Sequence, residues 1–162
     1  MSRTTRLPAL GRRGEGWVAG QLLLIAAVFF SALAGRGWSG SGAAAAYAVG
    51  GTLLALGLLL LAAGGLRLGA SLTPLPVPRS GGALKASGPY TLVRHPMYGG
   101  GILFALGWTI VFGSIASLGC TLALAVFLDL KSRREELWLA ERYDGYAAYR
   151  QRTPHRLLPF LY

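Results

Sequence analysis

The sequence predicts an all-α protein of the integral membrane class, built as a four-helix bundle. Hydrophobic residues make up 53% of the 162-residue chain and charged residues only 14%. The mean hydropathy of +0.48 is higher than an ordinary soluble domain shows. The apolar residues also gather in runs that approach the roughly 20 residues a helix needs to cross a bilayer. A chain of this length normally forms one domain, so residues 1–162 are predicted to be a single transmembrane domain.

Four apolar runs are the predicted spans. They are residues 17–34, 43–70, 98–112 and 115–130. The second contains Gly50-Gly51 and Gly64-Gly65, where a neighbouring helix can approach closely. The third and fourth are short and separated only by Gly113-Ser114, which predicts a C-terminal helical hairpin. Because both short runs are apolar on all sides, we expect them to span rather than re-enter the membrane. Residues 131–140 are rich in helix formers and are expected to continue the last helix.

The basic residues predict the orientation of the chain. Sixteen Lys and Arg against six Asp and Glu give a net charge of +10. With four spans, Arg36 is the only basic residue between the first two, and the others fall at the opposite ends. The positive-inside rule then places both termini in the cytoplasm. Topology and anionic membrane lipids account for the charge, so no nucleic-acid partner is expected. Enrichment in Ala, Gly, Leu and Arg favours a bacterial source, and hence the inner membrane.

The sequence predicts neither a disulfide within the chain nor a metal site. Cys120 is the single cysteine and lies in an apolar run. His95 and His155 are far apart and lack partners at the spacing of metal ligands.

Residues 88–100 form a dense group of polar, aromatic and glycine residues between the second and third apolar runs. Pro96 suits the first turn of a helix, with His95 as its cap, and the following N–H groups are expected to be unpaired and to attract an anion. The adjacent glycines leave room for a ligand or another helix. Tyr90 and Tyr98 offer faces for stacking on a base and hydroxyls for a ribose. The alternative is a capped helix with interfacial tyrosines; the gathering of all these features favours a site.

Two further clusters follow the fourth run. Glu135 and Glu136 point about 100° apart on a helix, so only one can face a given pocket. A carboxylate there can bind an amino group or ribose hydroxyls, or offset a sulfonium charge; the alternative is a solvated helix face. The third cluster, taken alone, predicts an interfacial aromatic and basic tail. It contains Tyr146, Tyr149, Arg150, Arg152 and Pro154.

Taken in order, these blocks resemble the isoprenylcysteine carboxyl methyltransferase family, which is related to the integral-membrane phospholipid N-methyltransferases. The resemblance covers residues 72–159. It rests on Gly88-Pro89-Tyr90, Val93-Arg94-His95-Pro96-Met97-Tyr98-x-Gly100, Glu135-Glu136 and Tyr146-x-x-Tyr149-x-x-Arg152-Thr153-Pro154. It departs from the family where Tyr143-Asp144-Gly145 replaces a Phe-Gly element, and in lacking the extra spans of the eukaryotic members.

The resemblance implies a cytoplasmic pocket for S-adenosylmethionine, formed by the loop before the third span, the start of that span and the end of the fourth. The cofactor-binding residues that it implies are Tyr90, His95, Pro96, Met97, Tyr98, Gly100, Glu135 and Glu136. Either Lys131 or Arg133 corresponds to a basic residue associated with the substrate carboxylate, and we assign Arg94 and Arg152 to the same substrate set. No residue stands out as a general base, so no catalytic residue is assigned.

The leading functional hypothesis is an S-adenosylmethionine-dependent membrane methyltransferase acting on a lipophilic acceptor. That acceptor is an isoprenylcysteine-like carboxylate, a lipid or another hydrophobic small molecule. One alternative is an NADPH-dependent sterol-type membrane reductase, which has a similar Arg-His-x-x-Tyr-x-Gly block. Another is a non-enzymatic helical membrane protein that uses glycine-rich faces for packing. Pro96 and the acidic pair favour the methyltransferase; the acceptor atom and the oligomeric state stay open.

Overall fold

The computed structural model describes residues 8–73, 75, 77 and 81–159, and this part of the chain is helical without strands. The long helices are α1 (Glu15–Ala32), α2 (Ala43–Leu68), α3 (Pro96–Phe112) and α4 (Ile115–Arg142). A short helix, α5 (Tyr146–Arg152), follows, and 3-10 turns occupy Gly69–Ser71 and Gly88–Thr91. The predicted all-α fold is confirmed.

Three helices are long and apolar enough to cross a membrane: α1, α2 with its following 3-10 turn, and α4. The third helix, α3, is apolar but has 17 residues, the lower limit for a span. It begins at Pro96 and ends before Gly113, whose left-handed φ of 59° closes the helix. As expected, α4 continues past the apolar run to Arg142.

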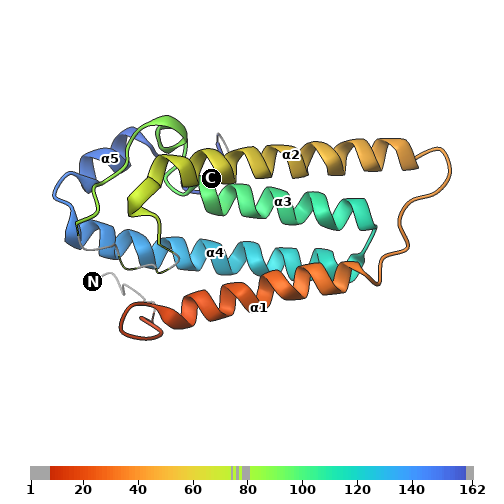
Figure 1. The fold of residues 1–162 in the computed structure, drawn as a ribbon, viewed down its shortest axis with the longest axis horizontal. Helices are drawn as coiled ribbons and strands as arrows, with labels where there is room; N and C mark the ends of the chain where they lie inside the picture. Colours follow the sequence, from red (N-terminus) through yellow and green to blue (C-terminus); the bar gives the residue numbers. More distant parts are fainter. Residues whose placement is uncertain (1–7, 74, 76, 78–80, 160–162) are drawn as a thin grey trace, which may run out of the picture.

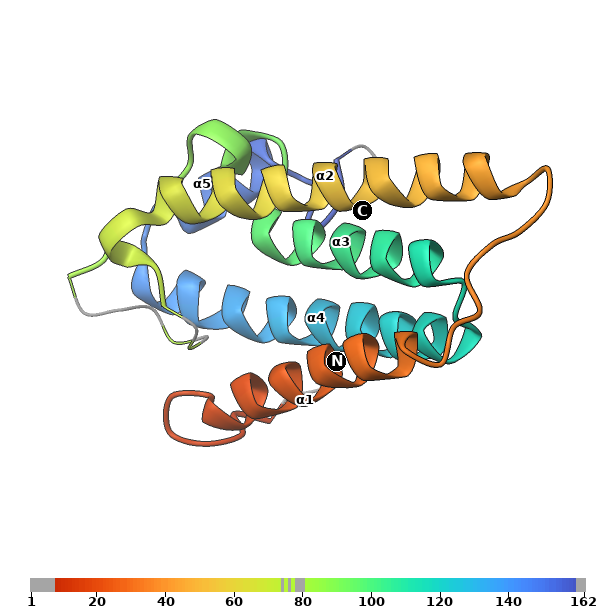
Figure 2. The same ribbon diagram turned by 45° about the vertical axis from the view of Figure 1, so that its right-hand side comes forward.

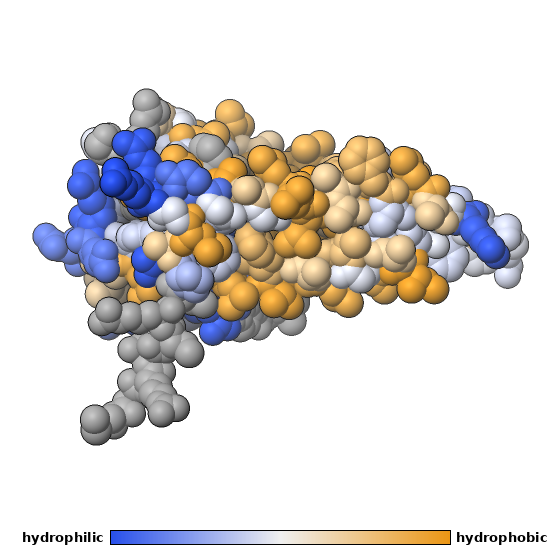
Figure 3. Space-filling model, turned by 90° about the horizontal axis from the view of Figure 1, so that it is seen from below, coloured by the Kyte–Doolittle hydropathy of each residue, from blue (hydrophilic) through white to orange (hydrophobic). Residues whose placement is uncertain are grey.

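The four long helices run alternately up and down, with α3 lying between α2 and α4 and α1 against α4 (Figures 1 and 2). The expected hairpin of α3 and α4 is present, yet α3 packs most extensively against α2. The start of α1, the end of α2, the start of α3, the end of α4 and α5 meet at one end, which we call the polar end. Hydrophilic residues gather there, and a hydrophobic surface covers the length of the helices (Figure 3).

Glycines bring α2 and α3 into backbone contact. A Cβ on Gly57 would lie 2.5 Å from the backbone nitrogen of Phe104 and 2.7 Å from the oxygen of Gly100. One on Gly107 would lie 2.6 Å from the oxygen of Gly50. Gly51, on the same helix, has nothing within 4 Å of such a Cβ. The close approach expected at the second span is therefore confirmed at Gly50 and Gly64 but not at Gly51, and it packs α3 against α2.

Hydroxyl groups tie α1, α3 and α4 together inside the bundle. The Thr109 hydroxyl lies 2.8 Å from that of Ser117 and 2.9 Å from that of Thr121. Ser117 also donates to the backbone oxygen of Val28 at 3.0 Å. Such bonds satisfy polar groups that lipid cannot. Beside them, an apolar core gathers around Val28 and Leu124.

Candidate functional site

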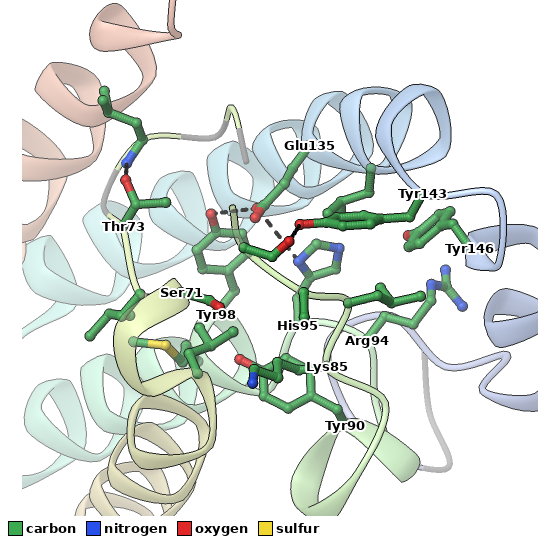
Figure 4. A pocket seen from close by; sticks show the side chains of 18 of the residues that line it. Ser71, Thr73, Lys85, Tyr90, Arg94, His95, Tyr98, Glu135, Tyr143 and Tyr146 are labelled. Carbon is green, nitrogen blue, oxygen red and sulfur yellow. Dashed lines mark hydrogen bonds and ion pairs between the residues drawn. The ribbon is translucent and has the colours of Figure 1, made fainter. Parts of the chain in front are cut away.

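A cavity of about 390 Å³ lies at the polar end (Figure 4). Its volume falls within the range of about 300–1,000 Å³ that is usual for small-molecule sites. Its walls come from α1, the end of α2, the loop before α3, the start of α3, the polar part of α4 and α5. The polar and aromatic side chains that line it are Gln21, Ser71, Thr73, Lys85, Tyr90, Arg94, His95, Tyr98, Lys131, Glu135, Tyr143, Tyr146 and Tyr149.

His95, Met97 and Tyr98, at the start of α3, line this cavity. His95 is the cap residue and Pro96 the first residue of the helix, as predicted. The N–H groups of Tyr98 and Gly99, however, both donate to the oxygen of His95 at 3.1 Å. The expectation that the N–H groups of Met97, Tyr98 and Gly99 are unpaired is wrong for the last two, because the carbonyl of a cap residue already accepts the first bonds of its helix.

Glu135 is the member of the acidic pair that faces the cavity. Its Oε2 accepts a hydrogen bond from the Tyr98 hydroxyl at 2.8 Å and lies 3.6 Å from His95 Nδ1. The rings of His95 and Tyr98 are stacked parallel, with centroids 5.4 Å apart. The start of α3 therefore holds the Glu135 carboxylate in one position, so the two blocks that the sequence keeps far apart lie in contact.

Glu136 points to the other side, into a buried ion-pair network. Its Oε1 lies 2.8 Å from Arg94 Nε, 3.2 Å from Arg156 Nε and 3.4 Å from His95 Nε2. Arg94 Nη1 donates to the backbone oxygens of Thr153 and Pro154 at 2.7 and 2.6 Å. Arg94 and Glu136 thus join the loop before α3, α4 and the segment after α5.

That segment, residues 153–159, which we call the tail, folds back across the start of α3. The N–H of Arg94 donates to the oxygen of His155 at 3.0 Å, and that of His95 to the oxygen of Arg156 at 2.8 Å. A Cβ on Gly99 would lie 1.9 Å from the oxygen of Leu157, so only glycine fits there. No described residue of the tail lines the cavity, yet the tail fixes the two residues that do, Arg94 and His95.

Lys131 of α4 lines the cavity and contacts α1. It is 2% exposed and donates to Oε1 of Gln21 on α1. Its Nζ lies 5.2 Å from the centroid of the Tyr98 ring, a cation–π arrangement. Ionisable residues in membrane-spanning helices are rare, so the buried Lys131 is a candidate functional residue.

The structure brings seven of the predicted site residues to the cavity wall: Tyr90, Arg94, His95, Met97, Tyr98, Lys131 and Glu135. It places the other five elsewhere. Pro96 lies beside Gly64 of α2, Gly100 packs against Gly57, and Glu136 belongs to the network with Arg94 and Arg156. Arg133 is exposed and pairs with Asp129 at 2.8 Å, and Arg152 is exposed on α5. Ligand roles for these five stay predictions without support from the cavity.

Tyr143, Tyr146 and Tyr149 line the cavity. The sequence analysis placed the last two at an interface and gave Tyr143 no role in the site. The predicted interfacial position of Tyr146 and Tyr149 is wrong: they are 2% and 3% exposed. Tyr149 donates to the oxygen of Tyr90 at 2.8 Å, and Tyr143 to that of Gly82 at 2.9 Å. Burial raises the pKa of Tyr149 to about 12, so its phenol stays neutral. The spacing of three on α5, which puts Tyr146 and Tyr149 on one face, was the available signal.

Gln21 is a site residue that the sequence analysis missed. No residue of the first span was assigned to the site, but Gln21 lines the cavity and accepts a hydrogen bond from Lys131. An amide inside an otherwise apolar run was the available signal, because uncompensated polar groups are rare there.

The family comparison covers the part of the chain that forms α2, α3 and α4. A model of the phospholipid methyltransferase family matches residues 45–145, which include most of α2, the loop, α3 and α4 with the acidic pair. The chain belongs to the phospholipid methyltransferase family. Together with the three apolar helices, this membership identifies an integral membrane protein of a methyltransferase family. The resemblance to membrane methyltransferases is thus confirmed at the level of the family.

Sequence similarity to individual proteins covers about half of the chain. The cobalt-zinc-cadmium resistance protein CzcN of Cupriavidus metallidurans is 36% identical over 77 residues, which are 47% of the chain and 36% of that protein. Delta(14)-sterol reductases match too. The Arabidopsis thaliana protein is 33% identical over 85 residues, covering 51% of the chain and 23% of the reductase. The Mus musculus protein TM7SF2 is 30% identical over 86 residues, covering 51% and 21%. The aligned part is therefore between about a fifth and about a third of each relative's length.

Proposed function

We propose that this protein is an S-adenosylmethionine-dependent methyltransferase that modifies a lipophilic acceptor at the membrane surface. The observation that carries the proposal is the Glu135 carboxylate, held by Tyr98 and His95 inside an aromatic cavity at the polar end. Membership of a methyltransferase family supplies the reaction class.

The residues of the cavity fit this cofactor by their chemistry. The cofactor combines a flat nucleoside with a sulfonium and an amino group, both positively charged. Glu135 supplies a negative charge, and Tyr90 supplies a ring on which a base can stack. His95, Met97 and Tyr98 complete the set that would hold it. When bound, S-adenosylmethionine supplies a methyl group that the sulfonium charge has already activated.

The acceptor is expected to bind on the Lys131 side of the same cavity. Leu72, Leu75 and Met97 provide an apolar wall for a hydrocarbon group, and the Lys131 ammonium can pair with an anionic group of the acceptor. Holding donor and acceptor in one orientation is worth up to about 7–11 kcal/mol in ideal cases. An acceptor that is already ionised needs no general base, which agrees with the absence of an assigned one. A bound cofactor and acceptor are expected to displace water from the reacting groups.

Titration calorimetry on the detergent-purified protein tests the cofactor assignment. We expect saturable binding of S-adenosylhomocysteine, and about tenfold weaker binding by the Glu135→Gln variant because a charge-assisted contact is lost. Glu141→Gln is the matched control, since Glu141 is an exposed carboxylate on the same helix. Transfer of labelled methyl from S-adenosylmethionine into an organic extract of the membranes tests the lipophilic acceptor.

A second candidate function, reduction with NADPH, is favoured by the similarity to the two sterol reductases. The same calorimeter separates the two, because NADPH is titrated in parallel. Binding of NADPH alone would favour the reductase. Binding of neither nucleotide would overturn the enzymatic proposal and favour a structural role.

A further inference from the structure

The Tyr146 hydroxyl is a buried polar group without a partner. Tyr146 is 2% exposed and lines the cavity, and its hydroxyl oxygen makes no hydrogen bond to any described residue. Leaving a buried hydroxyl unsatisfied costs stability, because the group has lost its bonds to water and gained none. In Figure 4 this oxygen lies on the side of the ring that faces His95 and Tyr143.

The neighbouring tyrosines show that the position is unusual within its own cluster. The Tyr149 hydroxyl donates to Tyr90 and the Tyr143 hydroxyl to Gly82, each to a backbone oxygen. The Tyr146 ring packs edge-on against Tyr149, with centroids 5.9 Å apart. The ring is therefore held by packing. In the ligand-free protein the hydroxyl makes no hydrogen bond that a phenylalanine at this position would lose.

We propose that Tyr146 is a ligand-binding residue whose hydroxyl donates a hydrogen bond to the nucleoside part of the bound cofactor. This inference rests on the proposed function and assigns one residue of its site. Burial keeps the phenol protonated by raising its pKa, with the charge of Glu136 adding to the effect. It is thus a neutral donor, suited to a ribose oxygen or a ring nitrogen rather than to a charged group.

The surroundings of Tyr146 favour the nucleoside over the charged end of the cofactor. Tyr90, Tyr146 and Tyr149 form one buried aromatic cluster, packed against Leu84 and Leu139. Flat apolar rings with a single donor match a base and its sugar. Glu135, the carboxylate assigned to the positive charges, comes from α4 and is held by α3. Recognition of the nucleoside and recognition of the positive charges therefore come from different walls of the cavity, so mutation can separate them.

The first test is the stability of the ligand-free protein. Tyr146→Phe keeps the packed ring and removes only the unsatisfied hydroxyl, so we expect its thermal midpoint to rise by about 2–4 °C. Tyr149→Phe is the matched control, and its midpoint is expected to fall by a similar amount because a buried hydrogen bond is lost. A fall for Tyr146→Phe would show that the hydroxyl is already satisfied in the free protein and would overturn the inference.

The second test measures binding of two probes by calorimetry. S-adenosylhomocysteine carries the nucleoside and the amino acid; 5′-methylthioadenosine carries the nucleoside without the amino acid. Tyr146→Phe is expected to weaken both probes about tenfold, whereas Glu135→Gln weakens only S-adenosylhomocysteine. Wild-type affinity of Tyr146→Phe for both probes would overturn this inference and leave the proposed function standing. Failure of the wild-type protein to bind either probe would overturn both.

Discussion

Arg156 joins two acidic residues of α4 through one guanidinium. Its Nη1 lies 3.1 Å from Asp129 Oδ1 and its Nε 3.2 Å from Glu136 Oε1. Because its side chain is only 20% exposed, these charged bonds are largely shielded from water. We expect Arg156→Gln to lower the free energy of unfolding by about 1–3 kcal/mol, measured by thermal denaturation in detergent. Arg152→Gln, exposed on α5, is the control and should behave as wild type. Equal stability of the two variants would show that the network does not hold the tail.

Tyr149 predicts a specific dependence of stability on alkaline pH. The unfolded chain releases a phenol proton near pH 10, whereas the folded protein keeps that of Tyr149 to about pH 12. Between these values the unfolded state binds fewer protons, so stability falls as pH rises. Tyr149→Phe should be less stable than wild type at pH 8, and its stability should fall less steeply from pH 10 to 12. Denaturant titrations at several pH values measure this; parallel curves for the two proteins would contradict it.

At the residue scale, the sequence predicted which side chains meet better than it predicted what each one does. The contact of His95 and Tyr98 with Glu135 follows from a chain that returns to the polar end after each helix pair. Which carboxylate faces the cavity depends on the rotation of α4 about its axis, and the spacing of two adjacent residues does not fix that rotation. Arg94 holds the tail by donating to the backbone oxygens of Thr153 and Pro154. A pattern of side chains in the sequence does not predict bonds to backbone atoms.

Helix packing in this bundle depends on the absence of side chains along one face of α2. Gly57→Ala places a Cβ 2.5 Å from the backbone of α3, and backbone atoms cannot rotate away. We expect a loss of about 1–3 kcal/mol from overpacking. Gly51→Ala, with open space around its Cβ, should be neutral or more stable by up to about 1 kcal/mol through helix propensity. Thermal unfolding of both variants measures the difference; equal effects would show that the helices do not touch there.

At the element scale, the lengths of the apolar runs predicted the helices closely, because lipid forces a polar chain to satisfy its backbone by helix formation. The expected starts of the second and fourth spans, Ala43 and Ile115, are the first residues of α2 and α4. The neighbours of each helix were harder to predict. The short Gly113-Ser114 connection predicted the hairpin of α3 and α4, which is present, but it did not predict that α3 packs most extensively against α2. The seven-residue spacing of Gly50, Gly57 and Gly64 puts these glycines on one face of α2, and this pattern is the sequence signal for the contact with α3.

The arrangement of the whole molecule predicts the side of the membrane that each loop faces. With Cys120→Ser as background, we expect an impermeant maleimide to label Ser39→Cys in intact cells, because the loop between α1 and α2 lies at the end opposite α5. Arg152→Cys should react only after the membrane is permeabilised, since the positive-inside rule puts the polar end in the cytoplasm. The reverse pattern would contradict the predicted orientation while leaving the bundle unchanged.

For the whole molecule, composition predicted the class of protein and the ordered blocks predicted its family. The enclosure of the cavity was not predictable in the same way. It depends on α5 turning its tyrosines inward and on α1 contributing Gln21, and both are long-range contacts without a local signal strong enough to specify them.

The path of the tail has a consequence for how the protein is made. Residues 153–159 follow all four long helices in the chain, so a ribosome releases them only after those helices have emerged and can enter the bilayer. Until then, Arg94 lacks the backbone oxygens of Thr153 and Pro154 to which it donates. Glu136 likewise lacks its ion pair with Arg156. The ion-pair network of Arg94 and Glu136 therefore cannot be completed until residues 153–156 have been synthesised, after all four long helices.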